Sequence, residues 1–288
     1  MANMPHTSRS RLRPLQVRLP LVLASLAIAA LILAPGTTAV AETVAFEVPY
    51  NGRTIKIEGE FKKPPGSNGP FPVVIGLHAC DGRTNYSTNF WLATLASQGY
   101  ATYLPDSFGP RGYVDVCALT SLVTTAERAQ DALVAAATLA ARPDIRADKI
   151  AILGVSHGAS GALRISRDDP SLALLRQKLA DAGGKIVAVV SVYGSCVPDV
   201  KRPVVTPLLI LVGSNDDWTL PKPCQEFANE GANPKLVQLH VYPGAMHSFD
   251  NASIFTPRLV YGHRVAFDAE ATDDARSRVI QFLRPLMQ

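Results

Sequence analysis

Alternation of apolar and polar positions marks the chain from residue 42 onward. Residues 43–48 and 54–61 alternate with a period of two, which predicts two short antiparallel strands with one buried face each. Later segments are almost continuously apolar, which is typical of strands that are covered on both faces. These predicted strands are residues 71–77, 101–104, 149–155, 185–192, 207–212 and 236–241.

Helical segments separate the apolar strands. The best marked begins at a capping box formed by Thr124 and Glu127 and stops before Pro143. Further helices are predicted over residues 88–98, from Ser156 onward and over about residues 273–283. This alternation predicts an α/β fold, with a mostly parallel central sheet and helices on both faces.

The N-terminal segment has the pattern of a secretory signal peptide. Residues 9–18 contain four arginines, residues 19–34 are mostly apolar, and Ala39 and Ala41 fit a small-residue cleavage site. We therefore predict a signal peptide over residues 1–41 and a single domain over 42–288, in the periplasm or secreted, without a stable membrane span. The alternative is an uncleaved anchor, but the apolar run is shorter than the ~20 residues of a spanning helix.

Composition excludes several classes of protein. The chain is 47% apolar and 18% charged, which is unlike a disordered chain. All four arginines of residues 1–41 lie in the predicted signal peptide, so residues 42–288 hold 24 basic and 24 acidic residues. That balance argues against nucleic-acid binding. The cysteines and histidines do not have zinc-site spacing, so we expect no metal.

The predicted strand 149–155 runs into the sequence Gly154-Val155-Ser156-His157-Gly158. A G-x-S-x-G pattern between strand and helix is the nucleophile elbow, in which glycines allow a tight turn that exposes the serine hydroxyl. Two alternatives are a dinucleotide-binding loop, whose glycine spacing differs, and an ordinary turn with a capping serine. The context favours Ser156 as a nucleophile.

Two later strand ends supply an acid and a base. Asp216 follows strand 207–212, and His247 follows strand 236–241, so the order along the chain is Ser, Asp, His. A serine hydroxyl needs a base to remove its proton and a carboxylate to orient that base. We predict His247 as the base and Asp216 as the acid, with Asp217 as the alternative acid.

With these residues the chain resembles the dienelactone hydrolase family of the α/β-hydrolase superfamily. The matching segments are residues 73–82, 105–112, 154–158, 213–218 and 243–250. The resemblance implies one compact α/β-hydrolase domain without a large cap, no cofactor, and hydrolysis of esters or lactones through an acyl-enzyme. Two positions depart from the founding members, which have a cysteine where this chain has Ser156 and a glutamate where it has Ala79.

The oxyanion hole follows from the mechanism and the resemblance together. Backbone N–H groups that face the developing oxyanion stabilise acyl transfer. One is expected from His157, the residue after the nucleophile, and the resemblance assigns the other to Cys80, with Ala79 as the alternative. The His157 side chain either faces the substrate or packs in the interior. His78 is expected to hold its loop in place.

Two further residues are candidate substrate contacts. Arg111 lies after strand 101–104, where it either binds a substrate carboxylate or braces its own loop against Asp106. Trp218 either lines the acyl pocket or covers the end of the sheet. His6, His240 and His263 are interpreted as surface or packing residues.

Four cysteines in an exported protein predict up to two disulfides, with three possible pairings. Cys196 and Cys224 follow strands at the same sheet edge, so we expect them to pair. Cys80 and Cys117 also follow two consecutive strands, and their bond would tie down the oxyanion loop.

The sequence thus predicts an exported serine hydrolase that acts on a small-molecule ester or lactone. A peptidase or polyester-degrading hydrolase with the same three residues is one alternative. A non-catalytic binding protein of the same fold is the other, although it would not need an intact Ser, Asp and His.

Overall fold

The computed structural model describes residues 1, 41–64, 66, 69–197, 202–230 and 233–288. The predicted signal peptide, residues 1–41, therefore lies almost wholly outside the described residues. Within the described part, no helix is long and apolar enough to cross a membrane.

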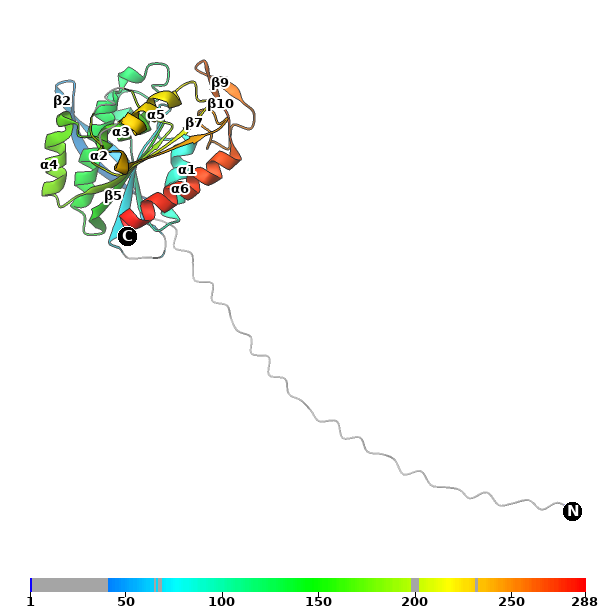
Figure 1. The fold of residues 1–288 in the computed structure, drawn as a ribbon. Coiled ribbons are helices and arrows are strands. Elements are labelled where there is room, and N and C mark those ends of the chain that lie inside the picture. Colours follow the sequence, from blue (N-terminus) through cyan, green and yellow to red (C-terminus); the bar gives the residue numbers. More distant parts are fainter. Residues whose placement is uncertain (2–40, 65, 67–68, 198–201, 231–232) are drawn as a thin grey trace. The chain divides into compact units, whose positions relative to one another are not determined.

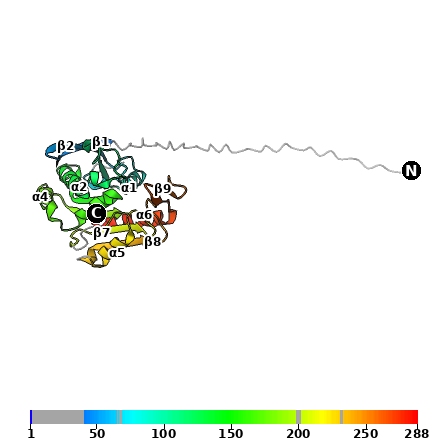
Figure 2. The same ribbon diagram turned by 90° about the horizontal axis from the view of Figure 1, so that it is seen from above.

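The domain is built on an eight-stranded sheet with the strand order β1-β2-β4-β3-β5-β6-β7-β8. Figure 2 shows β1 and β2 on the opposite side of the domain from β7 and β8. Strand β2 pairs antiparallel with β1 on one side and with β4 on the other, and the pairs from β4 through β3 to β8 are parallel. The mostly parallel sheet predicted from the sequence is confirmed. The strands are β1 Ala41–Tyr50, β2 Arg53–Lys62, β3 Phe71–Leu77, β4 Ala101–Pro105, β5 Ile145–Val155, β6 Ile186–Val192, β7 Leu208–Gly213 and β8 Val237–Tyr242.

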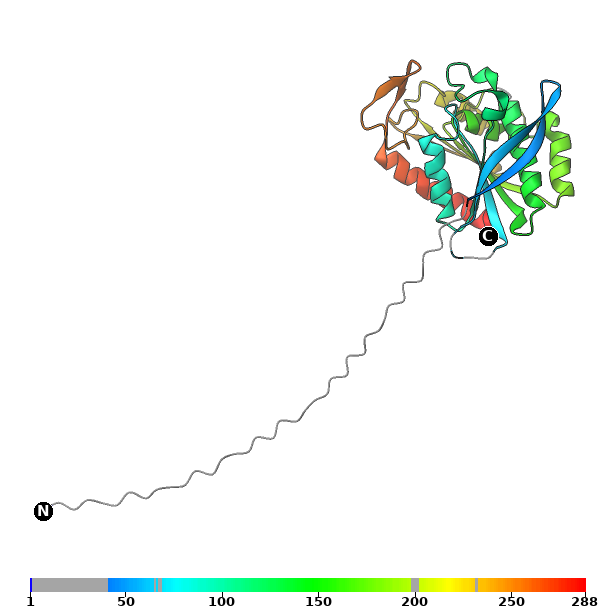
Figure 3. The same cartoon turned by 180° about the vertical axis from the view of Figure 1, so that it is seen from behind.

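Helices cover both faces of the sheet (Figures 1 and 3). Buried residues of α2, α3, α4 and α5 pack with one face, and those of α1 and α6 pack with the other. These two apolar layers are the core expected of a sheet with helices on both faces. The helices are α1 Tyr86–Ala96, α2 Thr125–Ala140, α3 His157–Ser166, α4 Ala173–Asp181, α5 Pro221–Glu230 and α6 Ala269–Met287.

The capping box predicted for α2 is present. The Thr124 hydroxyl accepts a hydrogen bond from the Glu127 backbone, and the Glu127 carboxylate accepts one from the Thr124 backbone at 2.6 Å. Helix α6 is longer at both ends than predicted, because Asp268 caps it and it continues through Pro285.

Three elements were not predicted from the sequence. Helix α4 buries little more than Leu179, so its apolar pattern is weak. Helix α5, which begins at Pro221, is the second of these elements. The third is the small hairpin of β9 (Arg258–Val260) and β10 (His263–Val265), whose strands are too short to show a periodic pattern. The hairpin matters for the site, since Val265 forms an isolated bridge with His247.

Candidate active site

Ser156 occupies the turn between β5 and α3, with backbone angles of φ 50° and ψ −115°. A positive φ is costly for a residue with a Cβ atom, so the surroundings must hold it in place. A Cβ atom at Gly158 would lie 2.1 Å from the carbonyl oxygen of Leu77, and one at Gly154 would lie 2.4 Å from that of Gly158. The two glycines therefore allow the turn to pack closely against the end of β3.

The three polar residues predicted from the strand ends form one hydrogen-bonded chain. Ser156 Oγ lies 3.0 Å from His247 Nε2, and His247 Nδ1 lies 2.8 Å from Asp216 Oδ2. All three side chains are buried. With the Nδ1 proton directed at Asp216, Nε2 is free to accept the proton of the Ser156 hydroxyl.

Asp216 is held by the residues that follow it. Its carboxylate accepts hydrogen bonds from the backbone of Trp218 at 2.9 Å and from the backbone and hydroxyl of Thr219 at 2.8 Å. The Asp217 carboxylate instead accepts hydrogen bonds from the backbone and the side chain of Arg264. The geometry thus favours Asp216 over Asp217 as the partner of His247.

The backbone N–H groups of Cys80 and His157 lie in the two segments that meet beside Ser156. His157 is the first residue of α3, so its N–H has no partner within that helix. Among the described residues, neither N–H group donates to a protein acceptor. Cys80 and His157 also line one cavity with Ser156.

Two cavities adjoin Ser156. The first, of about 420 Å³, extends toward α3 and is lined largely by hydroxyl side chains such as Thr125 and Ser195. The second, of about 250 Å³, is lined by His247 and by residues of the β9–β10 hairpin. Ser156 and Trp218 line both cavities.

The family model of the dienelactone hydrolase family matches residues 57–287. The chain belongs to the dienelactone hydrolase family. No curated protein sequence shows significant similarity to it. The confirmed family agrees with the resemblance derived from the sequence motifs.

Solved structures share the α/β-hydrolase fold with this family member. A dienelactone hydrolase-like promiscuous phosphotriesterase from metagenomic libraries is 22% identical, with a TM-score of 0.62, covering 85% of this chain and 99% of its own. Thermogutta terrifontis esterase 2, phosphorylated by paraoxon, is 14% identical, with a TM-score of 0.62, covering 87% and 95%. The dienelactone hydrolase of Anabaena variabilis is 18% identical, with a TM-score of 0.55, covering 86% and 99%. At these identities the likeness establishes the fold alone, and it agrees with a domain that has no large cap.

His78 and Arg128 support the Cys80 segment of this dienelactone hydrolase family member from inside. His78 Nδ1 lies 2.9 Å from the Ala79 carbonyl oxygen, and the Ser107 backbone lies 3.3 Å from Nε2, so the ring bridges two loops as predicted. Burial and the charge of Arg128 hold the pKa of His78 well below its usual value. The guanidinium of Arg128, which the sequence analysis missed, donates to the His78 carbonyl oxygen at 2.7 Å.

The His157 side chain lines the larger cavity but is 7% exposed. Burial and the nearby guanidinium of Arg128 lower the pKa of His157 to about 3. The imidazole is therefore neutral near pH 7. It packs in the interior and also forms part of the cavity wall.

Arg111 braces its own loop, which was one of the two interpretations of the sequence, but its partner is Asp131 rather than Asp106. Its side chain is fully buried and forms two hydrogen bonds with Asp131, at 2.8 and 2.9 Å, and another with the Ser107 carbonyl oxygen. It lines neither cavity at Ser156. Asp106, the expected partner, instead accepts hydrogen bonds from the backbone of Phe108 and Gly109. Arg111 is thus held against α2, and its buried position does not favour the alternative interpretation, contact with a substrate carboxylate.

Trp218 lines both cavities beside Ser156. Its ring stacks on His263, with ring centroids 4.9 Å apart, and is tilted against His247 at 5.0 Å. The Trp218 ring therefore borders the space beside Ser156 and also packs against the β9–β10 hairpin.

Asp250 is a buried carboxylate that the sequence analysis did not single out. It accepts hydrogen bonds from Ser87 at 2.6 Å, Trp91 at 2.6 Å and Tyr193 at 2.7 Å. Burial raises the pKa of Asp250, while these three donors act in the opposite direction. The only signal in the sequence was its place three residues after His247.

Both expected disulfides are present, Cys80 with Cys117 and Cys196 with Cys224. Disulfides are typical of proteins in oxidising compartments.

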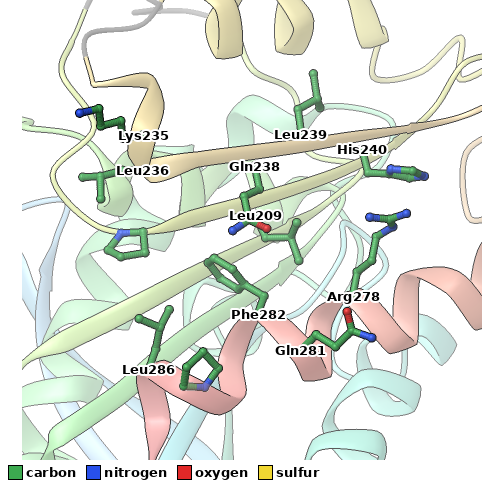
Figure 4. A pocket seen from close by; sticks show the side chains of 12 residues that line it. Leu209, Lys235, Leu236, Gln238, Leu239, His240, Arg278, Gln281, Phe282 and Leu286 are labelled. Carbon is green, nitrogen blue, oxygen red and sulfur yellow. The ribbon is translucent and has the colours of Figure 1, made fainter.

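A third cavity, of about 340 Å³, lies between β8 and α6 (Figure 4). Leu209, Phe282 and Leu286 point into it, while Arg278 and His240 lie at one end. Ser156, Asp216 and His247 do not line it, so it is separate from the candidate active site. Within the described residues, no group of three or more His, Cys, Asp or Glu side chains is arranged to hold a metal ion.

Proposed function

We propose that the protein is an exported serine hydrolase that cleaves carboxylic esters or lactones through an acyl-enzyme. The observation that carries the proposal is the chain of contacts from Ser156 Oγ through His247 to Asp216, at 3.0 and 2.8 Å. Family membership and the strained backbone of Ser156 support it. Export is supported by the signal-peptide pattern of residues 1–41 and by the two disulfides.

The reaction follows from the position of each group. His247 Nε2 takes the Ser156 proton as Oγ attacks the carbonyl carbon, and Asp216 stabilises the imidazolium. The backbone N–H groups of Cys80 and His157 stabilise the oxyanion, and His247 returns the proton to the leaving alcohol. Water then attacks the acyl-enzyme with the same base, which releases the acid.

Turnover of p-nitrophenyl acetate and labelling by a fluorophosphonate test the proposal. The wild type is expected to hydrolyse the ester and to be labelled at Ser156, while Ser156→Ala is expected to lose both with an unchanged far-UV circular dichroism spectrum. Ser166→Ala is the matched control, because Ser166 is also a buried serine at α3 but lines neither cavity at Ser156. Full activity of Ser156→Ala would refute the proposal.

A further inference from the structure

The segment that carries the Cys80 N–H, residues 79–82, is attached to the protein at both ends. We call residues 79–82 the oxyanion turn. On its N-terminal side, His78 is held by the Arg128 guanidinium and by the hydrogen bond to its ring from Ser107. These contacts fix the end of β3, but they do not reach Cys80 itself.

On its other side, the oxyanion turn contacts a surface loop of residues 113–119, which we call the strap. The Cys80–Cys117 disulfide joins the two segments, and the Val116 backbone donates to the Cys80 carbonyl oxygen at 2.8 Å. They also approach closely at Gly82, where a Cβ atom would lie 2.7 Å from the Val114 carbonyl oxygen. The disulfide therefore bonds the residue that supplies the N–H donor directly to the strap.

The strap is held by few contacts. It contains no helix or strand, and the side chains of Val114 and Leu119 are 86% and 55% exposed. Its buried side chains, Val116 and Cys117, belong to a small apolar cluster that also includes Cys80. Segments with few buried contacts open more readily than the core. Without the disulfide, the backbone bond from Val116 and this small apolar cluster would have to hold Cys80 against the loop.

We propose that the Cys80–Cys117 disulfide is a positioning device for catalysis, which holds the Cys80 N–H in line with the oxyanion. This inference rests on the proposed function. Oxyanion donors act because they are already in position before the reaction. A donor that is out of position for part of the time therefore stabilises the transition state less. The disulfide thereby makes full activity depend on an oxidising compartment.

The second disulfide provides a matched control. The two bonds join residues 37 and 28 positions apart, so the loop-closure entropy that each removes from the unfolded chain is similar. A merely stabilising role would give the variants Cys80→Ser/Cys117→Ser and Cys196→Ser/Cys224→Ser similar losses of stability and similar kinetics. A positioning role would lower kcat in the Cys80→Ser/Cys117→Ser variant but not in the Cys196→Ser/Cys224→Ser variant.

Steady-state kinetics with p-nitrophenyl acetate and thermal unfolding of the full mature protein are the test. Loss of a complete donor lowers kcat by roughly 10²–10³-fold. For Cys80→Ser/Cys117→Ser we therefore expect kcat to fall about ten- to hundredfold, with KM within about threefold of the wild type. For the Cys196→Ser/Cys224→Ser control we expect kcat within about threefold. The rate of fluorophosphonate labelling at Ser156 should follow kcat.

Reduction of the folded wild type gives a second measurement that needs no refolding. Cys80 and Cys117 are 6% and 9% exposed, whereas Cys196 and Cys224 are fully buried. Dithiothreitol passes two electrons to a disulfide, which gives two thiols and the cyclic oxidised reagent. Mild treatment is expected to reduce the Cys80–Cys117 bond first. Activity should fall in proportion to the number of thiols that alkylation and mass spectrometry detect, and reoxidation should restore it.

The outcomes distinguish this inference from the proposed function. Unchanged kcat after loss of the Cys80–Cys117 bond, or an equal decrease in the control, would overturn the positioning role while the hydrolase remains. A wild type that neither hydrolyses the ester nor is labelled at Ser156 would overturn both.

Discussion

Tyr193 connects the imidazole of His247 to the buried carboxylate of Asp250. The two rings pack edge to face with their centroids 4.6 Å apart, and the Tyr193 hydroxyl donates to Asp250 Oδ1 at 2.7 Å. Asp250 in turn binds Trp91 of α1 and lies three residues after His247. The loop that carries His247 is thereby fixed to both β6 and α1.

Tyr193→Phe tests this connection. The variant keeps the ring against His247 but removes one hydrogen-bond donor from the buried carboxylate of Asp250. Leaving a buried acceptor without its partner costs about 1–3 kcal/mol of stability. We expect the free energy of unfolding in urea to fall by that amount and kcat to fall only a few fold. Tyr100→Phe, at a buried tyrosine of the same core layer, is the control and should change neither quantity. Equal stability of the two variants would argue against the role of the Asp250 bond.

The choice between the two adjacent acids is settled by Asp216→Asn and Asp217→Asn. Replacing the acid of a Ser-His-Asp triad leaves the geometry but loses the useful tautomer, with a loss of roughly 10⁴-fold in kcat. Because Asp216 contacts His247 and Asp217 contacts Arg264, we expect that loss for Asp216→Asn alone. Asp217→Asn should keep kcat within about threefold. Steady-state kinetics at pH 8 would show the reverse order if the sequence alternative were right.

The sequence was informative where chemistry depends on local pattern. Gly154 and Gly158 are required by contacts shorter than 2.5 Å that a Cβ atom would make, so the turn at Ser156 has a signature in five residues. Asp216 and His247 could be predicted because parallel strands end at one edge of the sheet, which brings residues after β7 and β8 beside Ser156.

The sequence was uninformative where partners are chosen by packing. Arg111 has acidic residues both near and far along the chain, and only the packing of α2 against its loop places Asp131, rather than Asp106, beside it. The hydrogen bonds of Asp250 join residues up to 163 positions apart, so no local sequence pattern predicts them. The β9–β10 hairpin has three-residue strands, which carry too few positions for a period to be recognised.

The lowered pKa of His157 predicts a dependence of stability on pH. The unfolded chain binds a proton on this imidazole below about pH 6.5, whereas the folded protein binds it only near pH 3. The free energy of unfolding therefore decreases as the pH falls from about 6.5 toward 3, by about 1.4 kcal/mol per pH unit from this residue. His157→Gln should have a shallower dependence between pH 4 and 6.5 than the wild type, measured by urea denaturation.

The Arg111–Asp131 pair predicts a loss of stability without a change in substrate preference. Breaking a buried ion pair leaves one charge uncompensated and costs about 3–5 kcal/mol, whereas replacing both partners by apolar residues is often close to neutral. We therefore expect Arg111→Met to lower the free energy of unfolding by that amount, and Arg111→Met/Asp131→Leu to recover most of the loss. Both proteins should retain the wild-type ratio of kcat/KM for a neutral ester and a carboxylate-bearing ester, because Arg111 lines neither cavity at Ser156. A selective loss of activity on the carboxylate-bearing ester would instead assign Arg111 to substrate binding, which was the other interpretation of the sequence.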